Sequence, residues 1–86
     1  LVGSRFIGAN MTEINLSAAN ASGANLKGAN LTDAKLIRSR LRGANLAETD
    51  LTGANMKGAN LSDISQDKAI FCNTIMSDGR VERSGC

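Results

Sequence analysis

The sequence predicts an all-β solenoid, a chain wound into a coil with corners. Leu or a similar apolar residue recurs at nearly every fifth position from Leu1 to Leu61. A small residue precedes most of these sites by two positions, and seven of the nine glycines follow one by two positions. A period of five fits neither the apolar stripe of a helix nor one face of a straight strand. The chain direction must therefore change once in every repeat.

The repeating unit reads Ala-Asn-Leu-x-Gly. Its first three residues suit a short extended segment in which Ala and Leu face inward and Asn faces outward. The last two residues suit a corner, because Gly readily adopts the positive φ that tight turns need. Asn in the outward slot can form hydrogen bonds locally or with an Asn stacked above it. One unit buries almost nothing by itself, so the units must stack on one another.

This unit resembles the motif of the pentapeptide repeat family, Ala-(Asp/Asn)-Leu-x-x. The resemblance covers residues 1–61, and residues 69–76 look like continuations of it. It implies a right-handed quadrilateral β-helix of about four coils over residues 1–76, with four repeats in each coil. In such a coil every residue stacks on the residue four repeats later, and the apolar sites form columns along the axis. We expect six leucines in these columns to be almost fully buried: Leu26, Leu31, Leu36, Leu41, Leu46 and Leu51.

Two sites do not suit the core columns. Ala21 is too short to fill its place, and Gln66 would put an amide on the axis. For this reason we expect residues 63–68 to depart from the coil as an irregular stretch, in a helical turn or a loop.

The C-terminal residues 77–86 are expected to form a cap or tail. Cys72 and Cys86 bracket this segment, and Asp78-Gly79 signals a turn within it. Two unrelated thiols remain an alternative, but the placement favours a disulfide that fastens the cap. The pattern from Phe71 to Cys86 resembles the end of cyanobacterial and plastid pentapeptide repeat proteins, some of which reside in the thylakoid lumen. An oxidising compartment, thylakoid lumen or periplasm, is therefore favoured over the cytoplasm.

The N-terminal end shows no comparable cap. Leu1 and Val2 would leave an apolar coil end with open backbone groups. A preceding segment or an end-to-end homodimer through the N-terminal coil would cover it. The chain begins without Met, so a leader was removed or the sequence is a fragment.

No pattern of residues in the sequence indicates a reaction centre. The sequence has no His and no pairing of a nucleophile with a base, so we expect no catalytic, cofactor-binding or metal-binding residues and no enzymatic activity. No apolar run approaches the roughly 18 residues that cross a bilayer, so we expect no membrane insertion. The net charge is +2, and only two aromatic residues are present. This composition predicts no binding of nucleic acid.

One cluster of basic residues interrupts a mostly neutral surface. We interpret it either as an interaction patch for an anion or an acidic partner, or as a merely solvating face. Its members are Lys35, Arg38, Arg40 and Arg42.

The hypothesis that follows is a non-catalytic structural or protein-interaction scaffold with an unknown protein partner. A DNA-mimicking topoisomerase inhibitor, as some members of the resembled family are, is an alternative. It suits this chain poorly, because such mimicry requires a long acidic rod. A module that binds anions or acidic partners through the basic cluster is a second alternative.

Overall fold

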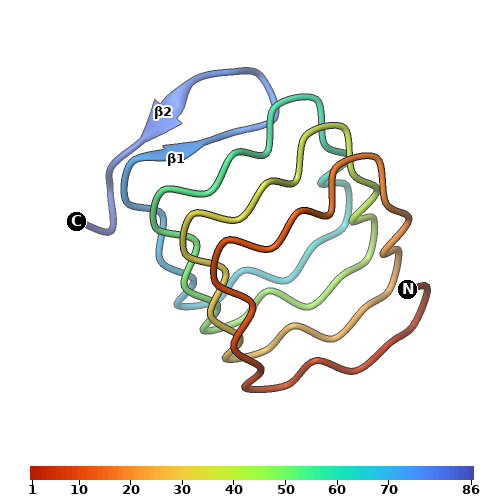
Figure 1. The fold of residues 1–86 in the computed structure, drawn as a ribbon. Coiled ribbons are helices and arrows are strands. Elements are labelled where there is room, and N and C mark those ends of the chain that lie inside the picture. Colours follow the sequence, from red (N-terminus) through yellow and green to blue (C-terminus); the bar gives the residue numbers. More distant parts are fainter.

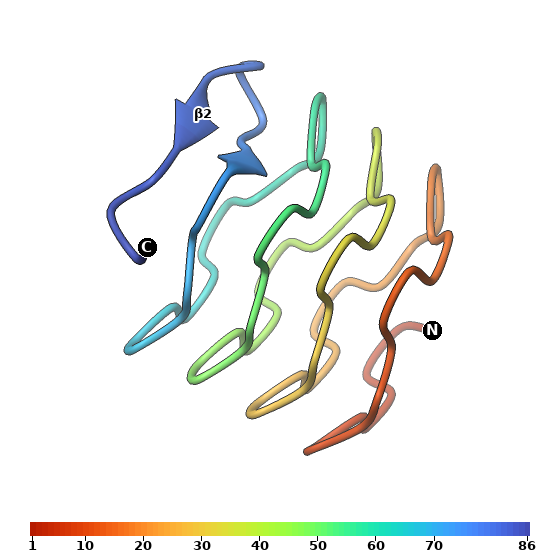
Figure 2. The same cartoon turned by 60° about the vertical axis from the view of Figure 1, so that its left-hand side comes forward.

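The backbone turns at every fifth residue and pairs with itself one winding later. The computed structural model describes residues 1–86, which measure 28 × 23 × 23 Å along the principal axes. Two-residue corners recur from residues 2–3 to 72–73, and we call the straight segment between two corners a wall. Parallel bridges join each wall to the wall twenty residues later, from Arg5↔Asn25 to Asn55↔Ile75. Figures 1 and 2 show the resulting stack of similar windings, with the two chain termini at opposite ends.

Hydrogen bonds between windings hold the walls together from both edges. The Leu46 N–H donates to the Ser65 carbonyl at 2.7 Å, one winding ahead, and the Asn45 N–H donates to the Ala24 carbonyl at 2.9 Å, one winding behind. Because walls are so short, only two segments count as strands: β1 (Thr74–Ile75) and β2 (Val81–Glu82). The chain contains no helix, and accordingly none that is long and apolar enough to cross a membrane.

The second residue of every corner adopts a left-handed conformation. Gly supplies it at seven corners, as the motif predicts, with φ between 67° and 74°. At the remaining corners a residue with a side chain adopts the same backbone conformation, which costs on the order of 1–2 kcal/mol for an L-residue. These eight residues have φ between 51° and 62°: Glu13, Ala18, Asp33, Arg38, Glu48, Asp63, Lys68 and Asn73. The winding, and not the local sequence, therefore sets the corner geometry.

The core is a narrow column of aliphatic side chains along the axis. The six leucines expected to be buried are at most 1% exposed, which confirms that prediction. Ala21 is also buried at 2% exposure, while Phe6 and Leu16 in the first winding are only half-buried. Leu and Met side chains at the apolar site are at most 1% exposed only in residues 21–60, where a winding lies on each side.

The expected departure from the coil at residues 63–68 is wrong. Ser65 forms the regular parallel bridge with Asn45, and Asp63 and Lys68 occupy ordinary corners. The reason lies in the position of Gln66 at the end of its column. No further winding of the column lies above it, so its amide is exposed to solvent and never has to enter the axis.

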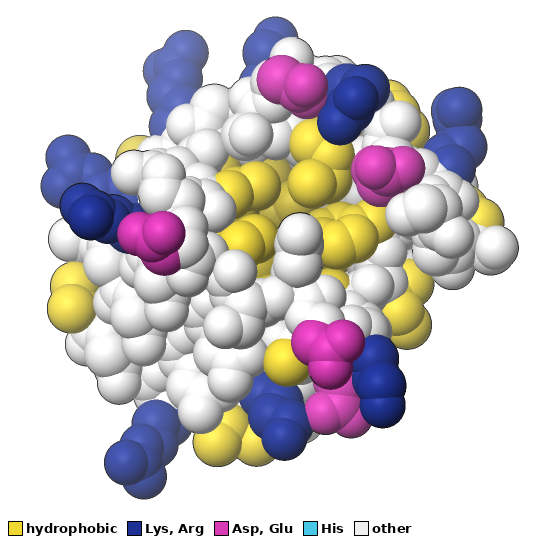
Figure 3. Space-filling model, turned by 180° about the vertical axis from the view of Figure 1, so that it is seen from behind, with side chains coloured by type: hydrophobic (Ala, Val, Ile, Leu, Met, Phe, Trp, Pro, Cys, Tyr) yellow, Lys and Arg dark blue, Asp and Glu magenta, His cyan; other side chains and the backbone are white.

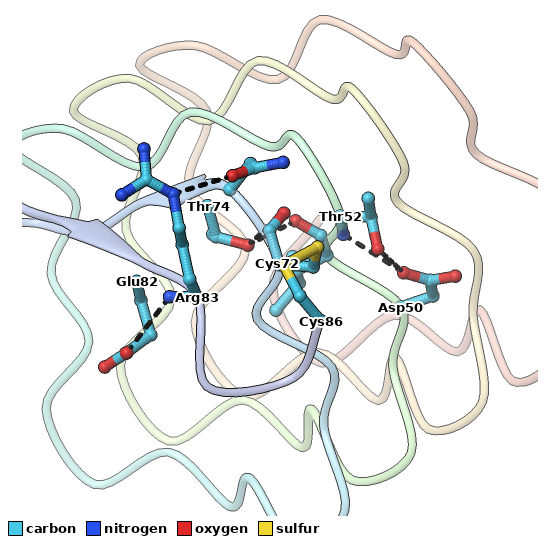
Figure 4. Close-up of a disulfide and its surroundings, with 9 residues drawn as sticks. Asp50, Thr52, Cys72, Thr74, Glu82, Arg83 and Cys86 are labelled. Carbon is cyan, nitrogen blue, oxygen red and sulfur yellow. Dashed lines mark hydrogen bonds between the residues drawn. A yellow bond between two sulfur atoms is a disulfide. The ribbon is translucent and has the colours of Figure 1, made fainter.

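The C-terminal segment folds back on the last winding. β2 pairs antiparallel with β1, and the Met76 N–H donates to the Arg80 carbonyl at 2.8 Å. A disulfide joins Cys72 to Cys86, the pair expected from the sequence (Figure 4). Residues 77–86 thereby supply partners to part of the open backbone edge of the last winding.

Apolar side chains are exposed to solvent at both ends of the coil. At the N-terminal end, Leu1, Val2 and Ile7 are 49%, 65% and 60% exposed. Figure 3 shows hydrophobic side chains gathered in the middle of one end of the coil, inside a rim of polar and charged groups.

Candidate interaction surface

Three of the four basic residues singled out in the sequence lie together. Lys35 projects from a wall, where it is bridged to Asn15 and Asn55, and Arg40 projects from the next wall along the chain. Arg38 occupies the corner that joins these two walls. All three side chains are exposed, so their charges are free to meet a partner.

Arg42 does not join them. It lies in the following corner, at residues 42–43, where its Nε is 3.7 Å from Oδ2 of Asp63. Both side chains are more than two thirds exposed, so this pair contributes little to stability. The pair nevertheless offsets the charge of Arg42 at that corner.

Lys57 takes the fourth place, and sequence reasoning missed it. Its carbonyl accepts the N–H of Arg38 at 2.8 Å, which places the two residues in adjacent windings at one corner. Lys57 is exposed and forms no ion pair. A stacking register applied to corner residues, as it was to the core columns, would have found it above Ile37. We call Lys35, Arg38, Arg40 and Lys57 the basic patch.

The basic patch lies on a side of the coil with little acidic charge. The columns that contain the four patch residues hold one acidic residue, Asp78. Its Oδ2 lies 3.9 Å from Nε of Arg80. The remaining chain carries six basic and eight acidic residues, once the four patch residues are set aside from ten basic in all. Several of these residues form ion pairs with one another, as between Nζ of Lys27 and Oε2 of Glu48 at 3.7 Å. The fold therefore separates a small net charge of +2 into a cationic side and a weakly anionic remainder.

The walls that carry the patch are held by side chains as well as by backbone pairing. In these walls the Oδ1 atom of each Asn accepts the N–H of the residue two positions later, at 3.0 to 3.2 Å. This bond closes the turn at the corner, which explains why Asn recurs just before the apolar site. The residues concerned are Asn15, Asn20, Asn55 and Asn60.

The interior offers few polar groups. Thr49 is fully buried and its Oγ1 donates to the Leu26 carbonyl at 2.7 Å, whereas the buried hydroxyl of Ser39 has no partner. The structure contains no pocket and no cluster of three or more potential metal ligands. Groups able to contact a partner lie on the outer walls, at the corners and at the two ends.

Comparisons with known proteins agree with this architecture. A family model described as pentapeptide repeats matches residues 1–36 and 29–64, with eight copies. A solved pentapeptide repeat protein from the thylakoid lumen of Arabidopsis thaliana is 26% identical with a TM-score of 0.60, and the match covers 95% of this chain and 68% of that one. Another, from Nostoc, is 29% identical with a TM-score of 0.49, covering 79% of this chain and 60% of that one. No curated protein matches.

Proposed function

Because this chain belongs to the pentapeptide repeat family, whose members fold as right-handed β-helices, we propose that it is a non-catalytic scaffold that presents its outer walls to a protein partner. Within that fold we propose a quadrilateral cross-section and about four coils. Bridges at twenty-residue spacing, combined with corners at every fifth residue, support this finer description.

One observation carries the functional proposal. The axis of the coil is filled by leucines with at most 1% exposure, so the interior of this coil leaves no room for a substrate. Enzymes and small-molecule binding proteins ordinarily use a concave site with convergent polar groups. In this chain the exposed polar side chains diverge from a rigid wall, an arrangement suited to contact with another macromolecule.

We propose the basic patch as the contact surface and an acidic protein as the partner. The four cations argue against the DNA-mimicking alternative, since a protein surface that binds DNA would repel them. Thylakoid lumen or periplasm is the proposed compartment. The disulfide and the lumenal source of the Arabidopsis relative support it.

We also propose an end-to-end homodimer through the first winding. The N–H groups of Asn10, Asn15 and Asn20 have no backbone partner, and exposed apolar side chains lie beside them. Light scattering across a concentration series tests this proposal. A monomeric mass at every concentration would refute it.

The scaffold proposal is tested by capture from a soluble extract of thylakoid lumen or bacterial periplasm. The parent protein and a variant lacking the basic patch are immobilised, and captured proteins are cross-linked and identified. We expect at least one acidic protein that the parent retains, the variant loses and free parent protein displaces. Identical capture by both proteins would refute the role of these walls.

A further inference from the structure

The asparagines beside the basic patch use their amide oxygens to bind the backbone and leave their NH₂ groups unbonded. In Asn55 the side-chain atom facing the N–H of Lys57, at 3.1 Å, must be the amide oxygen, because a backbone N–H only donates. The NH₂ group donates no hydrogen bond within the protein, so its two N–H donors remain available. The same reasoning applies to Asn60, whose Oδ1 lies 3.0 Å from the N–H of Ser62. The hydrogen-bond pattern thus fixes the amide orientation.

Most backbone carbonyls of these walls already accept hydrogen bonds. The carbonyl of Asn55 accepts the N–H of Leu36 at 2.7 Å, and that of Asn60 accepts the N–H of Leu41 at 2.9 Å. The carbonyls of Lys35 and Lys57 are likewise engaged by N–H groups of the preceding winding. What projects outward from the two walls and their shared corner is therefore mainly amide NH₂, ammonium and guanidinium. The acceptors among them are serine hydroxyls, the carbonyls of Arg38 and Gly58, and the Asp78 carboxylate at the C-terminal end of the corner.

We propose that these two walls and the corner between them, which we call the donor face, recognise a carboxylate-rich segment of a protein. This inference rests on the proposed function and names the chemistry of the partner. A cationic partner would be repelled by the four charges of the basic patch, and a neutral partner would leave those charges without a counter-charge at the interface. Carboxylates supply acceptors without donors, and each offers two oxygens with about four acceptor positions.

A protein segment fits this face better than a nucleic acid does. Binding of single strands relies on aromatic side chains that stack on bases, and the only two aromatic residues, Phe6 and Phe71, are half-buried and lie outside the donor face. The donor groups are also small and closely spaced, since rungs of neighbouring windings are separated by about 4.8 Å. Flexible Asp and Glu side chains can match such a grid.

The test uses variants that copy residues from the same column of the coil, so that the fold is preserved. Gly58 occupies the corner position one winding after Arg38, for example, and Arg38→Gly also removes a left-handed side chain. The donor-face variant combines four such changes: Lys35→Asn, Arg38→Gly, Arg40→Asn and Lys57→Ser. A control variant removes the same charge from other walls and corners: Arg5→Asn, Lys27→Ala, Arg42→Ser and Lys68→Gly.

The probe is a fluorescent peptide of about ten glutamates, measured by anisotropy against the intact, disulfide-bonded protein. We expect the parent to bind it and the donor-face variant to bind about tenfold more weakly or worse. The control variant should lose at most about threefold, and added salt should weaken binding of the parent. Equal losses in both variants would overturn the proposal, because net charge alone would then explain binding. Equal or tighter binding of a phosphate probe, either a single-stranded oligonucleotide or phosphatidylserine vesicles, would overturn it too.

A second pair of variants isolates the asparagine amides from the charges of the patch. Asp50 shows that Asp can take the outward slot and keep the turn, because its Oδ1 accepts the N–H of Thr52 at 3.0 Å. Asn55→Asp with Asn60→Asp should therefore keep the fold and abolish peptide binding. Asn30→Asp with Asn45→Asp, on other walls, changes charge equally and should have a smaller effect. Equal effects of the two pairs would refute recognition by the donor face.

Failure of this inference is distinguishable from failure of the scaffold proposal. If the parent ignores the glutamate peptide but the donor-face variant still loses its partner from the extract, the walls bind proteins through other chemistry. The inference would then be overturned while the scaffold proposal stands. If the parent binds the peptide through the donor face, but the parent and the donor-face variant capture the same proteins from the extract, the inference stands. The proposed role of these walls in binding a partner would then be refuted.

Discussion

Replacing Ser39 with Ala should make the protein more stable. Ser39 is 1% exposed, in a slot that Ala occupies in most repeats, and its hydroxyl finds no hydrogen-bond partner. Ala19 and Ala59 hold the equivalent places in the windings on either side. A buried hydroxyl without a partner costs about 1–3 kcal/mol, while its loss leaves only a very small gap. We therefore expect Ser39→Ala to raise the free energy of unfolding by about 1–2 kcal/mol.

The matched control is Thr49→Val, which removes a buried hydroxyl that does have a partner. Thr49 is fully buried, and its Oγ1 donates to the Leu26 carbonyl at 2.7 Å. That carbonyl also accepts the Ala29 N–H at 2.9 Å, so it is not left unpaired. We expect this variant to lose about 0.5–1.5 kcal/mol. The two substitutions should thus change stability in opposite directions, although each removes one buried hydroxyl.

Urea unfolding followed by far-ultraviolet circular dichroism is the suitable assay, since the chain has no Trp or Tyr. The midpoint for Ser39→Ala should rise with an unchanged slope. Thermal unfolding should shift upward by roughly 4–8 °C for each kcal/mol in a domain of this size. A lower or unchanged midpoint would refute the reasoning, because it would mean that the Ser39 hydroxyl is satisfied in solution. Ser39 lies between Arg38 and Arg40 but points inward, so capture by the basic patch should not change.

Three further predictions concern the core, the corners and the cap. Leu46→Asp should abolish cooperative unfolding, because it places an unpaired charge in a fully buried column, and thermal scans by circular dichroism would show a flat profile. Ala18→Gly should stabilise by about 1 kcal/mol in the urea assay, because φ is 62° at this corner, and a loss of stability would contradict our account of the corners. Thiol titration of the denatured, non-reduced protein should find neither Cys72 nor Cys86 free. Reduction should lower the free energy of unfolding by about 3 kcal/mol through the freed loop, and no change would argue against a stabilising staple.

The sequence by itself determined the winding, because a period of five allows only a chain that turns once in each repeat. Leu46 and Leu31 could be assigned to the core from their phase, and Gly53 to a corner from its offset. The same phase predicted that Lys35 and Arg40 face outward. Periodicity is a local property that every repeat carries, so it can be read without knowing any contact.

Only the tertiary structure decided what happens where the pattern breaks. Gln66 looked incompatible with the axis, yet it keeps the coil because the last winding leaves its column open to solvent. Ala18 accepts a left-handed corner because bonds to the next winding, such as that from its own N–H to the Ile37 carbonyl at 2.9 Å, outweigh the cost to a single residue. Lys57 joins Arg38, while Arg42 pairs with Asp63, because stacking brings together residues about twenty positions apart. The motif specifies what each repeat does, whereas neighbours across windings depend on the register of the whole coil.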